Sequence, residues 1–202
     1  MTKIIDNIVP REYENIIERL FLSTGFPWYI STKTVTPNDR SFIMSNKVTD
    51  IPQFTHMFFN SGSVTSDYFS HVKPFIKGLE EKTGRTYLDK IIRIKANLTY
   101  RNTAYPEDNY CSPHCDCSYD GGGSVKTDTL LYYVNESDGD TLVFNEMFGG
   151  EFVGNLTIKD RFSPKKGKSV LFDSTYQHAG TPPKLHDFRI VINFVFHNNK
   201  ES

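Results

Sequence analysis

The second half of the chain contains a series of short segments that are rich in β-branched and aromatic residues. Each segment has the length and composition of a β-strand, and the series comprises residues 91–100, 129–135, 141–144, 150–154, 169–172 and 188–196. Glycine, proline and aspartate interrupt the series at residues 121–123, 137–140, 164–167 and 182–183. Short strands that alternate regularly with turns are typical of a sandwich or barrel, so we predict a mainly β fold.

The first half of the chain adds two predicted helices. Apolar residues recur at helical spacing over residues 10–22 and again over residues 68–79. Gly84 marks the end of the second helix, and Pro74 indicates either a kink or a later start. Two short aromatic runs between the helices predict strands at residues 26–31 and 41–45. Helices of this kind are expected to pack on the outside of a sheet.

The chain has 202 residues and contains no linker, repeat or low-complexity segment, which predicts one domain over residues 1–202. Residues 1–86 would form an N-terminal support and residues 87–197 the β core. A net charge of −1 disfavours nucleic acid as a partner. Neither a membrane span nor a signal peptide is evident, and only three clustered cysteines occur, so we expect a soluble, cytoplasmic protein. The oligomeric state is left open.

One short motif contains potential metal ligands. His114 and Asp116 lie two residues apart, and in a strand such residues project from the same face. A third ligand would come from another strand, with His56, His71, His178, His186 and His197 as the candidates. His178 is the best placed, because it follows the strand at 169–172 and precedes two small residues. Two histidines and a carboxylate form the facial triad of non-haem Fe(II) oxygenases.

Arg189 is the second chemically unusual residue. It is the one charged residue in the apolar strand 188–196, eleven residues after His178. Its planar guanidinium could bind a carboxylate through two parallel hydrogen bonds, such as the distal carboxylate of 2-oxoglutarate. A structurally paired or edge-exposed arginine is the alternative.

In this order and spacing, the motifs resemble those of the Fe(II)/2-oxoglutarate-dependent dioxygenases, in particular the prolyl 4-hydroxylase-like branch. The resemblance covers about residues 93–197 and rests on His114-Cys-Asp116, the strands at 129–135, 138–144 and 164–172, His178 and Arg189. It implies a double-stranded β-helix (jelly-roll) core with the N-terminal helices packed outside. It also implies Fe(II), 2-oxoglutarate and O2 as cofactor and co-substrates, and it allows ascorbate as an additional cofactor.

Residue roles follow from the resemblance position by position. His114, Asp116 and His178 would bind iron, and Arg189 would bind 2-oxoglutarate. Tyr133 matches a tyrosine that often joins this arginine, although the neighbouring Tyr132 leaves open which of the two faces the site. Asn97 or Tyr100 would contact the co-substrate from the other side. The sequence departs from the family at Cys111, where a tyrosine is usual, and at Asp140, where glutamate is usual.

Other interpretations of the same residues remain open. Cys111, His114, Cys115 and Cys117 could bind structural zinc, although zinc sites usually draw paired ligands from separated segments. If residues 114–117 form a strand, Cys115 and Cys117 point away from His114 and Asp116. The loop from Cys117 to Lys126, with glycines at 121–123, is either a lid over the substrate or an inert surface loop.

The resemblance implies hydroxylation of an unactivated C–H bond, coupled to conversion of 2-oxoglutarate to succinate and CO2. A prolyl residue in a protein or peptide is the first substrate hypothesis. Oxygenation of a free amino acid or another small molecule comes next, with nucleic acid behind it. A cupin-like module that binds a metal or ligand without catalysis is the alternative outside the enzyme class, because a fold does not determine a function.

Overall fold

A computed structural model describes residues 2–34, 47–116, 126–147 and 156–198. Its main element is an eight-stranded sheet with the order β1-β9-β6-β11-β5-β3-β2, in which β4 also pairs with β3. The strands of this sheet are β1 (Lys3–Asp6), β2 (Tyr29–Ser31), β3 (Gln53–Asn60), β4 (Ser63–Val64), β5 (Ile91–Tyr100), β6 (Thr127–Tyr133), β9 (Lys168–Asp173) and β11 (Phe188–His197). The named pairs are all antiparallel, with β11 between β5 and β6.

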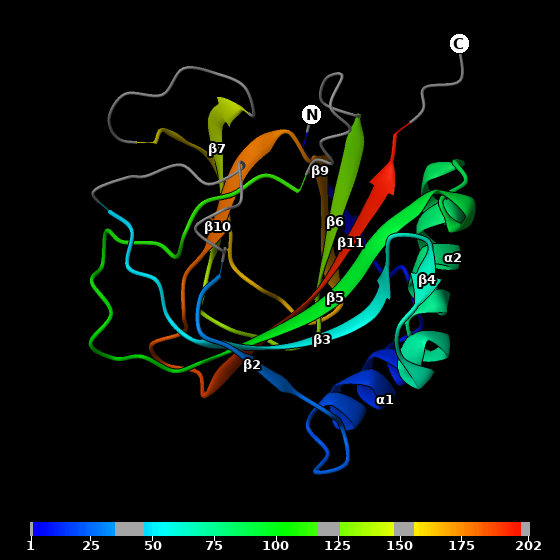
Figure 1. Ribbon diagram of the computed structural model, residues 1–202, viewed down its shortest axis with the longest axis horizontal. Coiled ribbons are helices and arrows are strands. Elements are labelled where there is room, and N and C mark those ends of the chain that lie inside the picture. Colours follow the sequence, from blue (N-terminus) through cyan, green and yellow to red (C-terminus); the bar gives the residue numbers. More distant parts are fainter. Residues whose placement is uncertain (1, 35–46, 117–125, 148–155, 199–202) are drawn as a thin grey trace.

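A second, three-stranded sheet lies opposite one face of the large sheet (Figure 1). Its order is β10-β7-β8, with β7 (Thr141–Met147), β8 (Ile158–Phe162) and β10 (Tyr176–Gly180). An isolated bridge between His114 and His178 extends this sheet beyond β10. The two facing sheets form the predicted double-stranded β-helix core, and the mainly β prediction is confirmed.

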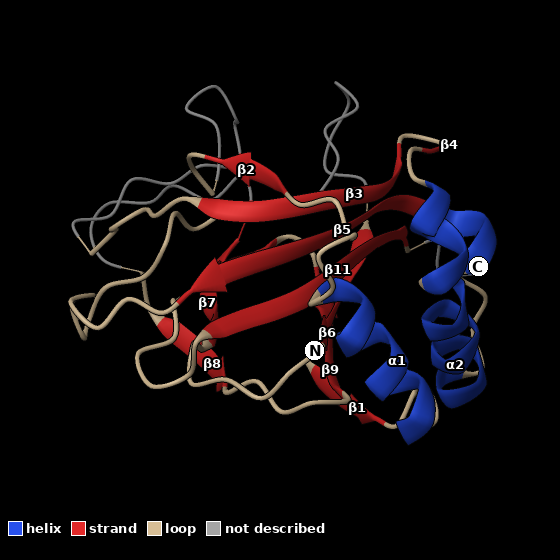
Figure 2. Ribbon diagram, turned by 90° about the horizontal axis from the view of Figure 1, so that it is seen from below, coloured by secondary structure: helices blue, strands red, loops and turns tan. Residues whose placement is uncertain are grey.

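Two helices cover the other face of the large sheet (Figure 2). α1 (Arg11–Phe21) begins after Pro10, whose backbone is extended, and α2 (Lys73–Thr83) carries Pro74 in its first turn, where no amide donor is lost. A 3-10 turn, η1 (Asp67–His71), precedes α2, so Pro74 marks a later start rather than a kink. Gly84 ends α2 in the left-handed conformation. None of the helices in the described part of the chain is long and apolar enough to cross a membrane.

Along the central strands, alternate side chains point to opposite faces of the large sheet: one set enters the hydrophobic core and the other faces the site. In β11, Ile190, Ile192 and Phe194 belong to the hydrophobic cluster under the helices, where the Phe75 ring of α2 lies 4.4 Å from the Tyr132 ring. The intervening residues of β11 face the small sheet. This period-two pattern leaves one face of the large sheet available for polar side chains.

The strand prediction was incomplete in the regions that surround the site. The expected strands at 91–100, 129–135, 141–144, 169–172 and 188–196 are present with small changes at their ends, and Tyr29–Ser31 lies in the segment 26–31. Sequence analysis did not predict β1, β3, β4, β8 or the 3-10 helix η2 (Leu88–Lys90), and it placed His178 after a strand rather than within β10. The strands expected at 41–45 and 150–154, and the glycines at 121–123, lie outside the described residues.

Candidate metal and co-substrate site

Pairing between two distant segments brings the candidate metal ligands together. The amide of His114 donates to the carbonyl of His178 at 3.0 Å, and the amide of His178 donates back to the carbonyl of His114 at 2.9 Å. The imidazole centroids lie 4.4 Å apart. One ligand atom from each of His114, Asp116 and His178 lies within 4.8 Å of the others. The structure therefore selects His178 among the candidate histidines.

Backbone carbonyls orient both imidazole rings. Nδ1 of His114 lies 3.2 Å from the carbonyl oxygen of Ser112, and Nδ1 of His178 lies 3.3 Å from that of Tyr176. A carbonyl only accepts a hydrogen bond, so these contacts place the ring proton on Nδ1. Nε2 of each ring then offers a lone pair. Burial, and then the neighbouring His178, lowers the pKa of His114 to about 4, which keeps this imidazole neutral at physiological pH.

Asp116 is the most densely hydrogen-bonded member of the cluster. Arg93 forms an ion pair with its Oδ1, Asn193 donates to Oδ2 at 2.8 Å, and Thr129 donates to Oδ2 at 3.2 Å. Burial alone would raise the pKa of Asp116, but the Arg93 guanidinium outweighs it and holds the pKa well below its usual range. The carboxylate is therefore ionised and fixed in orientation.

The cluster has the donor atoms that Fe(II) prefers. His178 Nε2 is buried, has no hydrogen-bond partner among the described residues, and lies 3.3 Å from Asp116 Oδ2. A lone pair facing a carboxylate oxygen is unfavourable unless a cation lies between or beside them. Two imidazoles and one carboxylate on one side of an ion match a facial triad with open positions.

Arg189 lies in the same pocket and is held in place by β7 and the turn before it. Its Nε donates to the carbonyl of Gly139 at 2.8 Å, and its Nη2 donates to Thr141 Oγ1 at 2.7 Å. The side chain is buried, and burial lowers its pKa. A Cβ atom at Gly139 would lie 2.9 Å from Arg189 Cδ, and one at Gly180 would lie 3.5 Å from Nη1. The two glycines thus leave room around a guanidinium that could bind a carboxylate.

The other predicted co-substrate residues are only partly brought to this pocket. Tyr133 faces the inner side of β6, whereas Tyr132 faces the helices. Tyr133 reaches Arg189 through Thr141, to which its hydroxyl donates at 2.9 Å. Asn97 lines the pocket, and its buried Oδ1 has no hydrogen-bond partner among the described residues.

The assignment of Tyr100 to the co-substrate requires correction. Tyr100 is 57% exposed and packs edge-on against Phe54, because it has the opposite strand parity from Asn97. Thr99, next to it, lines the pocket instead.

The cysteines do not join the metal cluster in the described part of the chain. Cys115 Sγ donates to the Thr175 carbonyl at 3.1 Å and accepts from Gln177 Nε2 at 2.9 Å. Cys111 lines the pocket, whereas Tyr110 packs against Phe144. Cys117 lies outside the described residues. The zinc interpretation is therefore wrong for Cys111 and Cys115, which belong to no group of potential metal ligands found there.

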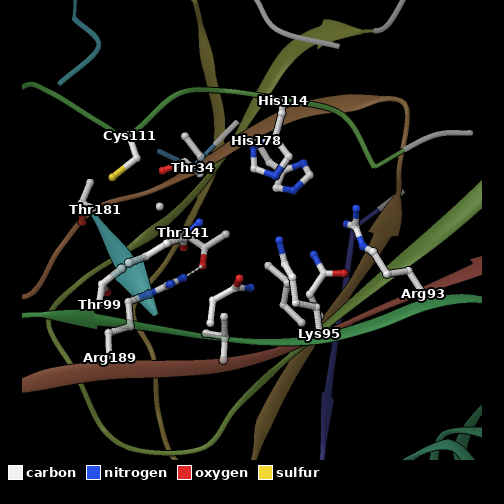
Figure 3. A pocket seen from close by; sticks show the side chains of 17 residues that line it. Thr34, Arg93, Lys95, Thr99, Cys111, His114, Thr141, His178, Thr181 and Arg189 are labelled. Atoms are coloured by element: carbon white, nitrogen blue, oxygen red, sulfur yellow. Dashed lines mark hydrogen bonds between the residues drawn. The ribbon is translucent and has the colours of Figure 1, made fainter. Parts of the chain in front are cut away.

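Polar side chains from both sheets line the pocket between the triad and Arg189 (Figure 3). Sequence analysis missed several of them, including Arg93, Lys95, Thr141 and Asn193. The available signal was the alternation in β5, where Arg93, Lys95, Asn97 and Thr99 all lie on one face. A polar strand face equally fits solvent exposure, so this pattern alone does not predict a site.

The two-sheet core combines a His-x-Asp…His cluster that could hold a metal ion with a buried arginine that lines the same pocket. Residues 100–197 match the family model described as the 2OG-Fe(II) oxygenase superfamily. This match covers just under half of the chain, and the fold agrees with the likeness. This superfamily uses Fe(II), 2-oxoglutarate and O2, for which the donor atoms of the site are suited. A search of curated proteins finds no significant match.

Similar solved structures agree on the fold. An oxidoreductase of the 2OG-Fe(II) oxygenase family from Burkholderia pseudomallei is similar with a TM-score of 0.64 and 10% identity, over 98% of this chain and 86% of that one. The viral collagen prolyl hydroxylase of Paramecium bursaria Chlorella virus-1, solved with 2OG, is similar with a TM-score of 0.55 and 13% identity. The similarity covers 98% of this chain and 96% of that one. The non-haem α-ketoglutarate-dependent epimerase SnoN from nogalamycin biosynthesis is similar with a TM-score of 0.57 and 12% identity. The similarity covers 98% of this chain and 78% of that one.

Proposed function

We propose that the chain is a dioxygenase that uses Fe(II) and 2-oxoglutarate to hydroxylate an unactivated C–H bond. Two observations carry this proposal: His114, Asp116 and His178 form one cluster, and both histidines line the same pocket as Arg189. His114, Asp116 and His178 would hold the iron, and Arg189 would hold the distal carboxylate of 2-oxoglutarate. When bound, the iron supplies the oxidation chemistry, in which one atom of O2 enters the substrate and the other enters succinate.

The chain's own residues would prepare the site in three ways. The Ser112 and Tyr176 carbonyls keep the imidazole lone pairs directed inward, which suits metal binding. Arg93, Asn193 and Thr129 hold Asp116 in one orientation. Thr141 and the Gly139 carbonyl fix the plane of the Arg189 guanidinium, so less side-chain freedom is lost when it binds a carboxylate.

The first substrate class that we propose is a prolyl residue in a protein or peptide. It is supported by the motif order and by likeness to a fold that includes a viral collagen prolyl hydroxylase. A free amino acid or other small molecule is the second candidate, since an epimerase from nogalamycin biosynthesis has a similar fold. The polar pocket and a net charge of −1 favour both classes over nucleic acid.

The decisive experiment measures succinate formed from 2-oxoglutarate during an Fe(II) titration, with and without a prolyl peptide. We expect iron-dependent succinate, and a gain of one oxygen atom in the mass of the accepted substrate. His178→Ala should lower this turnover about 100-fold or more, because it removes one of three ligands. His71→Ala, beside α2, is the matched control and should retain activity.

Succinate that does not depend on iron, or normal turnover by His178→Ala, would contradict the proposal. No turnover of any substrate across the full iron range would favour the cupin-like binding module instead. Addition of ascorbate to the same assay tests whether it acts as an additional cofactor.

A further inference from the structure

The pocket contains more cationic side chains than the binding of iron and 2-oxoglutarate requires. Arg93 and Lys95 line it from β5, and Arg189 lines it from β11. None of the described residues that line this pocket is an aspartate or a glutamate. With Fe(II), Asp116 and a 2-oxoglutarate dianion in place, these groups and the three cations together still carry a net positive charge.

Two of the three cations already have partners. Arg189 is bound to Gly139 and Thr141 and is assigned to the distal carboxylate of 2-oxoglutarate. Arg93 forms an ion pair with Asp116, which does not itself line the pocket. Lys95 forms no hydrogen bond or ion pair with any residue that the structure describes. Its side chain extends from β5 toward His114 and His178 (Figure 3).

Lys95 is poorly placed to be satisfied by water alone. The side chain lines the pocket and is only partly exposed, and burial, followed by the charge of Arg93, lowers its pKa to about 8. A cation that is partly removed from water and lacks a partner is unfavourable, and a bound anion would relieve that cost.

The position of Lys95 separates it from the 2-oxoglutarate carboxylates. In Figure 3, Lys95 points toward His114 and His178, whereas Arg189 lies to the left of it, so we assign the distal carboxylate to Arg189 and not to Lys95. The other carboxylate of 2-oxoglutarate is assigned to the metal. Asp50 is a further protein carboxylate to consider as a partner for Lys95. It accepts hydrogen bonds from the Thr34 amide at 2.9 Å and from the Thr34 hydroxyl at 2.6 Å, and it does not line the pocket.

We propose that the substrate carries a carboxylate close to the C–H bond that is oxidised, and that Lys95 binds this carboxylate with Arg93 beside it. The proposal rests on the proposed function and narrows its substrate class. One ammonium without a partner suits a singly charged group, because the Arg93 guanidinium is engaged with Asp116. The carboxylate could belong to a free amino acid or to an acidic residue next to a prolyl residue in a peptide.

Binding of matched acid and amide probes tests this directly. The full chain is loaded with Mn(II) and 2-oxoglutarate, and binding is measured by calorimetry without turnover. The amino acid pair is L-proline and L-prolinamide. The peptide pair is acetyl-Pro-Asp-amide and acetyl-Pro-Asn-amide. We expect the acid to bind about tenfold more tightly than the amide in one pair, as a charge-assisted hydrogen bond provides, and that pair identifies the source of the carboxylate.

Three variants assign the preference to Lys95. Lys95→Met removes the charge while retaining the length, and it should abolish the acid preference. Lys95→Arg should restore most of the preference. Lys77→Met, on the exposed side of α2, loses the same charge and should leave the preference intact. Because Lys95 has no partner to lose, Lys95→Met should melt no lower than the wild type, which confirms that it folds.

Equal binding of acid and amide in both pairs, or an acid preference that survives Lys95→Met, would overturn the proposal. A loss of 2-oxoglutarate affinity in Lys95→Met would also overturn it, because Lys95 would then serve the co-substrate. Failure of the proposed function would be seen separately, as absent 2-oxoglutarate binding and absent succinate formation in the wild type.

Discussion

At the scale of single residues, the site depends on groups that hold the ligand side chains in place. Asp116 shows this most clearly, because Arg93 and Asn193 fix a carboxylate that the metal would otherwise have to orient. Arg189 has an equivalent arrangement, with Thr141 accepting from both its guanidinium and the Tyr133 hydroxyl. Preorganised groups of this kind lower the cost of binding.

Arg189→Lys tests the co-substrate assignment. Lysine keeps the charge but lacks the planar fork, and it leaves the Gly139 carbonyl without its donor. We expect the KM for 2-oxoglutarate to rise about tenfold or more, with metal affinity unchanged, measured by steady-state kinetics and by metal titration.

Arg161→Lys is the matched control for this variant. Arg161 pairs with Asp140 at the surface, and its replacement should leave the KM for 2-oxoglutarate unchanged. An unaltered KM in Arg189→Lys would remove Arg189 from the co-substrate site.

At the scale of elements, the site is assembled by β10, β11 and the segment that contains His114 and Asp116, which lies far earlier in the sequence. Sequence analysis identified His114 and Asp116 by their two-residue spacing and His178 by its position after a predicted strand. It identified Arg189 as the one charged residue in an apolar strand. It missed β3, because Phe54, Met57 and Phe59 place apolar side chains on both parities and hide the alternation. It missed Arg93 and Lys95 because a polar strand face looks the same whether it meets solvent or a pocket.

One acidic side chain ties the turn between β6 and β7 to the segment that leads into β11. Asp138 accepts hydrogen bonds from the backbone amides of Lys184, Leu185 and His186, at 2.9 to 3.0 Å, and it contacts His186 Nδ1 at 2.9 Å. Burial opposes ionisation, but these bonds prevail and hold the pKa of Asp138 below its usual range. The contact anchors the start of the strand that carries Arg189.

Asp138→Asn should therefore reduce stability in a pH-dependent manner. A carboxyl whose pKa is lower in the folded state stabilises that state above its unfolded pKa of about 3.9, and the contribution is lost as pH falls below that value. We expect the variant to lose about 1–2 kcal/mol at pH 7 and to approach the wild type in strong acid. Urea unfolding from pH 7 to pH 2 measures this, and a pH-independent difference would reject the explanation.

At the scale of the whole molecule, the three residues of the triad come from two segments that lie far apart in the sequence. His114 and Asp116 precede β6, whereas His178 belongs to β10 in the small sheet. An ion bound by all three would cross-link these segments in the folded state only. Metal binding should therefore be coupled to global stability.

Mn(II), which is redox-silent here, should raise the melting temperature of the intact chain. At a metal concentration about 100 times the dissociation constant, linkage supplies about 2.7 kcal/mol, equivalent to roughly 5–10 °C for a chain of this size. A chelator should reverse the shift, and His178→Ala should abolish most of it. Scanning calorimetry provides the measurement, and an equal shift in His178→Ala would contradict the coupling.

The ends of the large sheet have a consequence for the protein in concentrated solution. The outermost strands are β1 and β2, which have four and three residues. A strand from another molecule could form only a few ladder hydrogen bonds with either of them. The long strands that carry Lys95 and Arg189 lie inside the sheet, with both backbone edges already paired. The architecture thus shields the strands that carry Lys95 and Arg189 from edge-to-edge aggregation.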